Sequence, residues 1–106
     1  MDAGFPDDDR EAAWAGAMRA AQTGDRAAYE RLLREIADAI RGPVRWRLAR
    51  FGMSASEAED VVQEVLVTLH RKRDTWDPER PFLPWLAALA RRRATDATRR
   101  AGRARR

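Results

Sequence analysis

The sequence predicts an all-α fold, a compact bundle of four main helices, and three observations support this prediction. Apolar residues recur every three or four positions in each long segment, which is the period of a helix packed on one face. Even in VVQEVLV (61–67) the apolar pairs recur every four residues, so a strand is disfavoured. Glycine and proline concentrate at a few junctions, where they end helices. A chain of 106 residues provides one domain with a modest core.

The first helix is predicted to cover about a dozen residues and to end at Gln22, before Thr23-Gly24. Residues 1–8 are expected to be a disordered acidic lead, with Asp8 or Asp9 capping the helix. The residues expected on its inner face are Trp14, Ala17, Met18 and Ala21.

Asp25 is placed to cap the second helix, and Gly42-Pro43 is expected to break the chain after it. Its inner residues would be Tyr29, Leu32, Leu33, Ile36 and Ile40. A separate short segment, 44–51, follows and is stopped by Gly52. That segment places Val44, Leu48 and Phe51 on one side and Arg45, Arg47 and Arg50 elsewhere.

The third helix is predicted to begin at an S-x-x-E capping box formed by Ser56 and Glu59, and to run to about Arg71. Its inward residues would be Val61, Val62, Val65, Leu66 and Leu69. Asp60, Gln63, Glu64 and Val67 fall on the opposite face. Such a face suits either a basic or mixed partner surface or simply solvent, and the residues alone favour solvent.

The irregular connection KRDTWDPERPFLP (72–84) leads into the last helix, which is predicted to start near Pro81–Pro84. Its inner face would carry Trp85, Leu86, Leu89, Ala90, Arg93, Ala94 and Ala97. Asp96 is expected to pair with Arg100, four residues later. The helical domain is expected to span residues 9–101, with a basic tail at 102–106.

Charge is distributed unevenly along the chain. Residues 1–11 carry five acids against Arg10, whereas residues 91–106 carry eight arginines against Asp96. A basic C-terminal end suggests a polyanionic partner. For the residues beyond Gly102, an arginine tail that is simply solvated is an equally good interpretation. The absence of cysteine, of a long apolar run and of a secretory signal together predict a cytoplasmic protein.

Catalysis, a metal and a cofactor are not expected. His70 lies among Arg71, Lys72 and Arg73, a poor setting for a metal ligand or a general base. The aspartates at 7–9 have no histidine or cysteine beside them, and no glycine-rich phosphate loop is present.

Aromatic and arginine residues in 75–100 predict binding to a single nucleic-acid strand, because bases stack on rings while guanidinium groups pair with phosphates. Trp76 and Phe82 flank Asp-Pro-Glu-Arg-Pro and could form a cup for an extruded base, with Asp77 and Arg80 among the polar groups. Alternatively, both rings plug the end of the bundle; Trp85 is assigned to the core. The outer side of the last helix carries Arg91, Arg92, Thr95 and Arg99.

Three segments in this order and spacing resemble region 2 of bacterial RNA polymerase sigma factors of the extracytoplasmic-function group. They are GDRAAYERLL (24–33), SEAEDVVQEVLVTLHR (56–71) and TWDPERPFLPWLAALARRRATDATRR (75–100). The resemblance covers nearly the whole chain. It implies no enzyme activity, and the linker and helix-turn-helix region that follow in that family are absent from the sequence.

The resemblance also assigns roles to the faces found above. It implies that Asp60, Gln63, Glu64 and neighbouring Val67 bind the β′ clamp helices of core RNA polymerase. The loop from Trp76 to Phe82, with Asp77 and Arg80, would capture a base flipped from the nontemplate strand of the promoter −10 element. Arg91, Arg92, Thr95 and Arg99 would contact the same strand. An anti-sigma factor is an expected further partner.

Arg92 departs from the family pattern, because LARR stands where many members have a motif like IARN. Arginine holds phosphate or a guanine edge but does not reproduce the paired donor and acceptor of an amide. Two alternatives to promoter recognition remain at this stage. One is a sigma-like domain that binds polymerase or an anti-sigma factor without choosing a DNA sequence, and the other is a nonspecific basic nucleic-acid binder.

Overall fold

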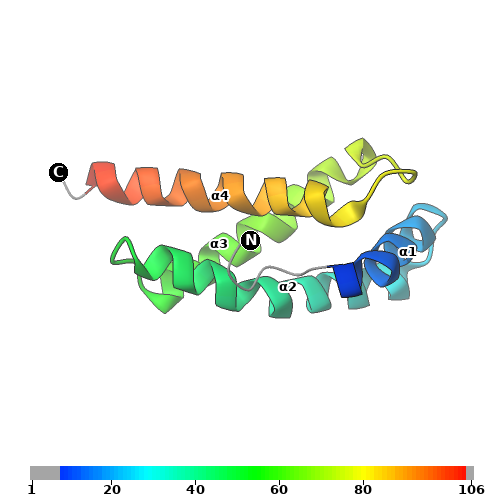
Figure 1. Cartoon of the computed structure of the whole chain (residues 1–106), viewed down its shortest axis with the longest axis horizontal. Helices are drawn as coiled ribbons and strands as arrows, with labels where there is room; N and C mark the ends of the chain where they lie inside the picture. Colours follow the sequence, from blue (N-terminus) through cyan, green and yellow to red (C-terminus); the bar gives the residue numbers. More distant parts are fainter. Residues whose placement is uncertain (1–7, 105–106) are drawn as a thin grey trace.

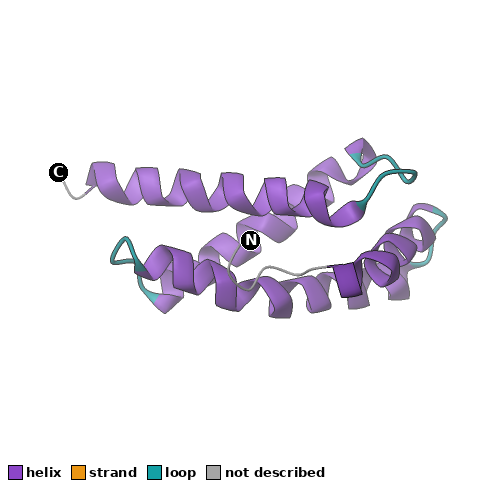
Figure 2. Cartoon of the chain, viewed as in Figure 1, coloured by secondary structure: helices purple, strands orange, loops and turns teal. Residues whose placement is uncertain are grey.

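The computed structural model describes residues 8–104, and within that range every regular element is helical, which confirms the all-α prediction (Figure 2). The elements are η1 (Asp8–Arg10), α1 (Glu11–Gln22), α2 (Arg26–Ala49), α3 (Ala55–Lys72), η2 (Arg73–Thr75) and α4 (Phe82–Ala104). Of the expected acidic lead, residues 1–7 lie outside the described residues, and Asp8 begins η1. Residues 102–104 continue α4, whereas 105 and 106 also lie outside the described range.

The four α-helices form an elongated bundle that measures 47 × 25 × 21 Å. Helices α2 and α4 run along its long axis, α3 packs behind both, and α1 packs against one end of α2 (Figure 1). This arrangement leaves one long side of α4 facing solvent. None of the described helices is long and apolar enough to cross a membrane.

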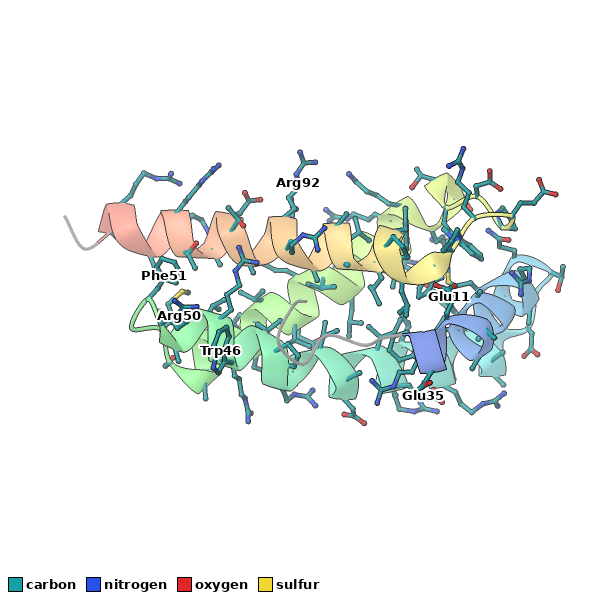
Figure 3. All side chains as sticks on the ribbon, viewed as in Figure 1. Glu11, Glu35, Trp46, Arg50, Phe51 and Arg92 are labelled. Carbon is teal, nitrogen blue, oxygen red and sulfur yellow. The ribbon has the colours of Figure 1, made fainter. Side chains whose placement is uncertain are left out.

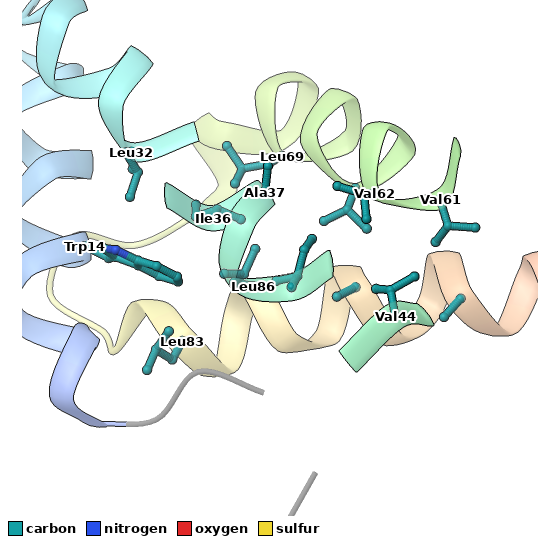
Figure 4. Packing of buried hydrophobic residues seen from close by; sticks show 14 of the residues in the cluster. Trp14, Leu32, Ile36, Ala37, Val44, Val61, Val62, Leu69, Leu83 and Leu86 are labelled. Carbon is teal, nitrogen blue, oxygen red and sulfur yellow. The ribbon is translucent and has the colours of Figure 1, made fainter. Parts of the chain in front are cut away.

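The core is built from the apolar stripes of all four helices (Figure 4). Ile36, Ile40 and Leu48 of α2 and Val62 of α3 are completely buried, as the helical spacing predicts. Leu66, Trp85 and Leu89 are partly buried and pack against this core, which confirms the assignment of Trp85. No polar or charged residue is buried in the part of the chain that the structure describes. The fold therefore depends on apolar packing.

Three of the predicted helix boundaries, at Gly24, Asp25 and Gly52, are confirmed by local geometry. The carboxylate of Asp25 accepts a hydrogen bond from the backbone N–H of Ala28 at 3.0 Å, which caps α2. Gly24 and Gly52 adopt φ angles of 101° and 73°, a left-handed conformation that glycine reaches without steric cost.

The predicted cap of α1 is wrong. Asp8 and Asp9 form η1, and the residue that precedes α1 is Arg10, whose side chain makes no capping hydrogen bond. The short 3₁₀ turn moves the helix start past both aspartates.

The capping box of α3 lies two residues earlier than predicted. Ser54 accepts a hydrogen bond from the N–H of Glu57 at 3.1 Å, and the Glu57 carboxylate accepts one from the N–H of Ser54 at 2.7 Å. The sequence contains two overlapping S-x-x-E patterns, and the extended backbone of Ser54 directly after the Gly52 turn selects the first. Glu59 of the second pattern is engaged by Arg41 instead.

The predicted break at Gly42-Pro43 is also wrong, because α2 continues through Pro43 for 24 residues. Proline removes one backbone donor, but Ile40, Val44 and Leu48 form one uninterrupted buried stripe across it. Packing of that stripe outweighs the local cost. Phe51, predicted to face inward, is 54% exposed, because α2 ends at Ala49 and the helical period no longer applies.

Candidate nucleic-acid interface

The solvent-facing side of α4 carries the arginines singled out from the sequence. Arg91, Arg92 and Arg99 are exposed, and Figure 3 shows Arg92 directed away from the bundle. Thr95 lies between them and is only partly exposed, because its Oγ1 accepts a hydrogen bond from Nη2 of Arg47 on α2 at 2.9 Å. The four residues therefore share one surface, with Thr95 at its edge toward α2.

Two other arginines of α4 are paired with acidic side chains of the same chain. Arg93 donates to Asp96 at 3.0 Å, and Arg100 donates to Glu64 of α3 at 3.3 Å. The predicted Asp96–Arg100 pair is therefore wrong, because Arg100 faces α3 and Asp96 pairs with Arg93 one turn earlier. The buried stripe of Leu86, Ala90, Ala94 and Ala97 fixes how α4 rotates about its axis, and hence which arginines face solvent.

The expectation that Trp76 and Phe82 are exposed is wrong. Their side chains are 2% and 0% exposed, and their rings meet edge to face with centroids 5.5 Å apart. The ring of Trp14 on α1 also meets Phe82 edge to face, with the two ring centroids 6.4 Å apart. The alternative interpretation holds: both rings plug the end of the bundle and support the loop from beneath.

The loop 77–81 itself presents polar groups. Its turn is closed within the loop, where the Asp77 carboxylate accepts a hydrogen bond from the N–H of Glu79 at 2.9 Å. Arg80 lies 3.7 Å from Asp77, with its side chain 80% exposed. Arg19 of α1 donates to the carbonyl of Pro78 at 3.2 Å and holds the loop against the bundle. Asp77 and Arg80 thus lie on a fixed turn beside the start of α4.

The start of α4 is capped by Glu11, a residue of α1 that no sequence motif marks as a cap. The carboxylate of Glu11 accepts hydrogen bonds from the N–H groups of Phe82 and Leu83, at 2.7 and 2.9 Å. A helix N-terminus has unpaired N–H groups and a partial positive charge, so a carboxylate stabilises it twice over. In the sequence, Glu11 stands out only as the last acid of the acidic N-terminal stretch.

A second exposed surface lies on α3. Asp60, Gln63 and Val67 are exposed, with Val67 at 49%, whereas Glu64 is partly covered through its bond to Arg100. At one edge, both carboxylate oxygens of Glu59 accept hydrogen bonds from Arg41, at 2.8 and 3.1 Å. This bidentate bond lowers the pKa of Glu59 and raises that of Arg41.

His70 lies at the end of α3 and contacts Tyr29. The Tyr29 hydroxyl and His70 Nδ1 share a hydrogen bond of 2.9 Å, and burial raises the pKa of Tyr29. Across the residues described, no group of three histidine or acidic side chains is arranged to hold a metal ion.

Comparison with known proteins decides the family. The Sigma-70 region 2 family matches residues 27–104. The chain belongs to this family. The match covers α2, α3 and α4 almost completely and leaves α1 outside. The family is one of non-catalytic transcription factor domains, as the sequence implied.

Three curated relatives of this Sigma-70 region 2 domain are sigma factors. The extracytoplasmic-function (ECF) RNA polymerase sigma factor SigF of Caulobacter vibrioides is 36% identical over 77 residues, which are 73% of this chain and 41% of SigF. The ECF RNA polymerase sigma factor RpoE of Cereibacter sphaeroides is 33% identical over 89 residues, 82% of this chain and 47% of RpoE. RNA polymerase sigma factor CarQ of Myxococcus xanthus is 32% identical over 82 residues, 77% of this chain and 45% of CarQ. The alignments span less than half of each relative, and no solved structure matches the chain.

Proposed function

We propose that this Sigma-70 region 2 domain binds core RNA polymerase through α3 and the melted nontemplate strand of the promoter −10 element through α4 and the loop 77–81. The observation that carries this proposal is the separation of two exposed surfaces of different chemistry. One is the acidic and apolar face of α3, and the other is the arginine-rich face of α4.

On the polymerase side, the proposed contacts are Asp60, Gln63, Glu64 and Val67. Asp60 and Gln63 are exposed, and Val67 adds an exposed apolar surface between polar neighbours. Exposed apolar side chains rimmed by polar groups are typical of protein-binding surfaces. Glu64 already accepts a hydrogen bond from Arg100, so it would contact the polymerase while keeping that bond.

On the DNA side, the proposed contacts are Arg91, Arg92, Thr95 and Arg99 of α4, together with Asp77 and Arg80 of the loop. The arginines would neutralise phosphates and Arg92 would read a base edge, with guanine as the preferred match for its two parallel donors. Trp76 and Phe82 contribute as positioning residues beneath the loop, because neither ring is open to a base.

Strand opening in this scheme needs no catalytic group. Unstacking a base costs a few kcal/mol, and contacts of the extruded base with the loop and of phosphates with α4 offset that cost.

The cytoplasm is the proposed compartment, and an anti-sigma factor is a further proposed partner. If the anti-sigma factor and the polymerase bind the same face of α3, Asp60→Ala should weaken the binding of both.

The decisive experiment is fluorescence anisotropy with a labelled library of nontemplate −10 oligonucleotides, with and without a β′ clamp-helix fragment. We expect sequence-selective binding that strengthens with the fragment. Arg92→Ala should weaken it and lower the slope of log K against log salt by about one. Arg34→Ala, which removes an exposed arginine of α2 that belongs to neither proposed surface, is the matched control.

Asp60→Ala should abolish the gain from the clamp fragment while leaving affinity for the free oligonucleotide intact. Equal binding of all library sequences together with a response to the fragment would exclude promoter recognition and leave only a polymerase-docking domain. Equal binding without any response to the fragment would leave a nonspecific nucleic-acid binder.

A further inference from the structure

An exposed aromatic side chain with a cation on its face lies at the end of α2, outside every surface assigned above. Trp46 is 56% exposed, and the guanidinium carbon of Arg50 lies 5.0 Å from the centroid of its ring. Figure 3 shows both side chains near the end of α2 that lies below the C-terminal half of α4. More than half of Trp46 is exposed, so packing within this chain uses only part of the surface of this large side chain.

This pair adjoins the arginine face of α4 through one hydrogen bond. Arg47 reaches from α2 to Thr95 at 2.9 Å, and Thr95 is flanked on α4 by Arg92 and Arg99. Going round α2 from Arg47 toward solvent, Arg50 comes next and then Trp46, because residues three and four apart are neighbours on a helix surface. The solvent-facing surface therefore runs without interruption from α4 over Arg47 to Trp46.

The charge of this surface is of one sign. The segment 41–50 contains four arginines and no acidic residue. Arg41 is engaged by Glu59 and Asp38 on the side toward α3, and Arg45 lies close enough to Glu59 to lower the pKa of that carboxyl. On the side toward α4, Arg47 donates to a neutral hydroxyl and Arg50 covers a ring. An anion is the complementary partner for that side.

A flat ring beside guanidinium groups fits one class of polyanion particularly well. Bases stack on an aromatic face, and neighbouring arginines pair with the phosphates, so single-stranded nucleic acid satisfies both groups. An apolar protein surface would cover Trp46 but would leave Arg50 desolvated and without a counter-charge.

We propose that Trp46 and Arg50 form a second binding position for an unpaired nucleotide of the strand bound by α4. The strand passes from Arg92 and Arg99 over Arg47, one base stacks on Trp46, and Arg50 contacts the adjoining phosphate. This inference rests on the proposed function, which places the strand on α4. The groups that would bind the additional nucleotide, Trp46 and Arg50, lie at the end of α2.

The test compares a short oligonucleotide, which covers the −10 element alone, with versions extended at one end or the other by a few unpaired thymidines. Trp46→Ala should weaken binding of one extended oligonucleotide by about fivefold or more, the usual effect of losing a base–aromatic stack, and leave the short one unchanged. Trp46→Phe should retain most of the gain, whereas Trp46→Leu should behave as Trp46→Ala. Arg50→Ala should weaken the same oligonucleotide and lower its salt dependence.

Arg34→Ala again serves as the charge-matched control, and circular dichroism melting checks that the Trp46 variants remain folded. No effect of Trp46→Ala on either extended oligonucleotide would overturn the proposal. Full rescue by Trp46→Leu would also overturn it, because apolar area alone, as in a protein contact, would then suffice. Failure of the short oligonucleotide to bind selectively would contradict only the proposed function, while a Trp46 effect on the extended strands would still support this position.

Discussion

Glu11 caps the helix that begins at Phe82. Its two carboxylate oxygens accept hydrogen bonds from the N–H groups of Phe82 and Leu83, 71 and 72 residues further along the chain. Glu11 lies outside the segment 27–104 that matches the Sigma-70 region 2 family. Helix α1 thus holds the start of the proposed DNA-binding helix from outside the matched segment.

Loss of this cap should destabilise the domain measurably. We expect Glu11→Ala to lower the free energy of unfolding by about 0.5–2 kcal/mol, because two N–H groups at the helix start lose their acceptor. Glu11→Gln retains one good acceptor, so its free energy of unfolding should lie between those of the wild type and Glu11→Ala. Urea unfolding followed by circular dichroism measures this, with exposed Glu30→Gln as a control. Equal stability of Glu11→Ala and the wild type would show that water replaces the carboxylate at no cost.

Replacing Pro43 should stabilise α2. Pro43→Ala restores a backbone donor inside a continuous helix, and we expect a gain of roughly 1–3 kcal/mol in the free energy of unfolding. The neighbouring Gly42→Ala is a useful comparison, since a Cβ there meets nothing within 4 Å and should add about 0.5–1 kcal/mol. A lower melting temperature for Pro43→Ala would indicate that α2 needs a bend that proline provides.

The Arg41–Glu59 bond should make stability depend on pH in the acid range. The pKa of Glu59 is lowered in the folded protein, so its stabilising contribution is complete above its ordinary value of 4.5 and is lost as the pH falls through the folded value. The difference in melting temperature between the wild type and Glu59→Gln should therefore shrink as the pH falls from 7 to about 3. Glu30→Gln removes an exposed carboxylate from the helix that carries Arg41 and should show no such trend.

Burial of Trp76 and Phe82 predicts a stability defect before any defect in DNA binding. Phe82→Ala should cost about 3–5 kcal/mol, a large part of the stability of a small domain. Trp76→Phe removes less volume and should leave oligonucleotide affinity close to the wild type at temperatures well below its melting point. A loss of affinity in folded Trp76→Phe would mean that the Trp76 ring turns out of the core to meet a base.

Helix periodicity was sufficient to predict the fold class and most of the core. Residues such as Ile36, Ile40, Val62 and Leu69 recur at helical spacing on one face of their helices, and all four are completely buried. It failed where two local signals competed. At Pro43 the stripe outweighed the break, and at Ser54 and Ser56 two overlapping patterns differed only in backbone context.

Within the candidate site, sequence predicted which arginines of α4 face solvent but not what the other side chains do. The aromatic residues 76 and 82 match a base-binding cup and a buried plug equally well. Only the burial of both rings, and the contact of Phe82 with Trp14 of α1, distinguish the two. Arg47 and Glu11 were not singled out because their partners, Thr95 and Phe82, are distant in sequence. The one usable signal for Trp46 was an aromatic residue among arginines on the polar side of α2.

The buried plug beneath the loop has a consequence for the entropy of binding. Because Trp76 and Phe82 are packed, and because Arg19 holds the Pro78 carbonyl, the loop is ordered when the domain folds. Ordering a flexible segment during association normally consumes part of the interaction energy. In the proposed complex that cost falls on folding, so DNA would meet a preorganised loop, and association would spend little of its interaction energy on ordering the loop.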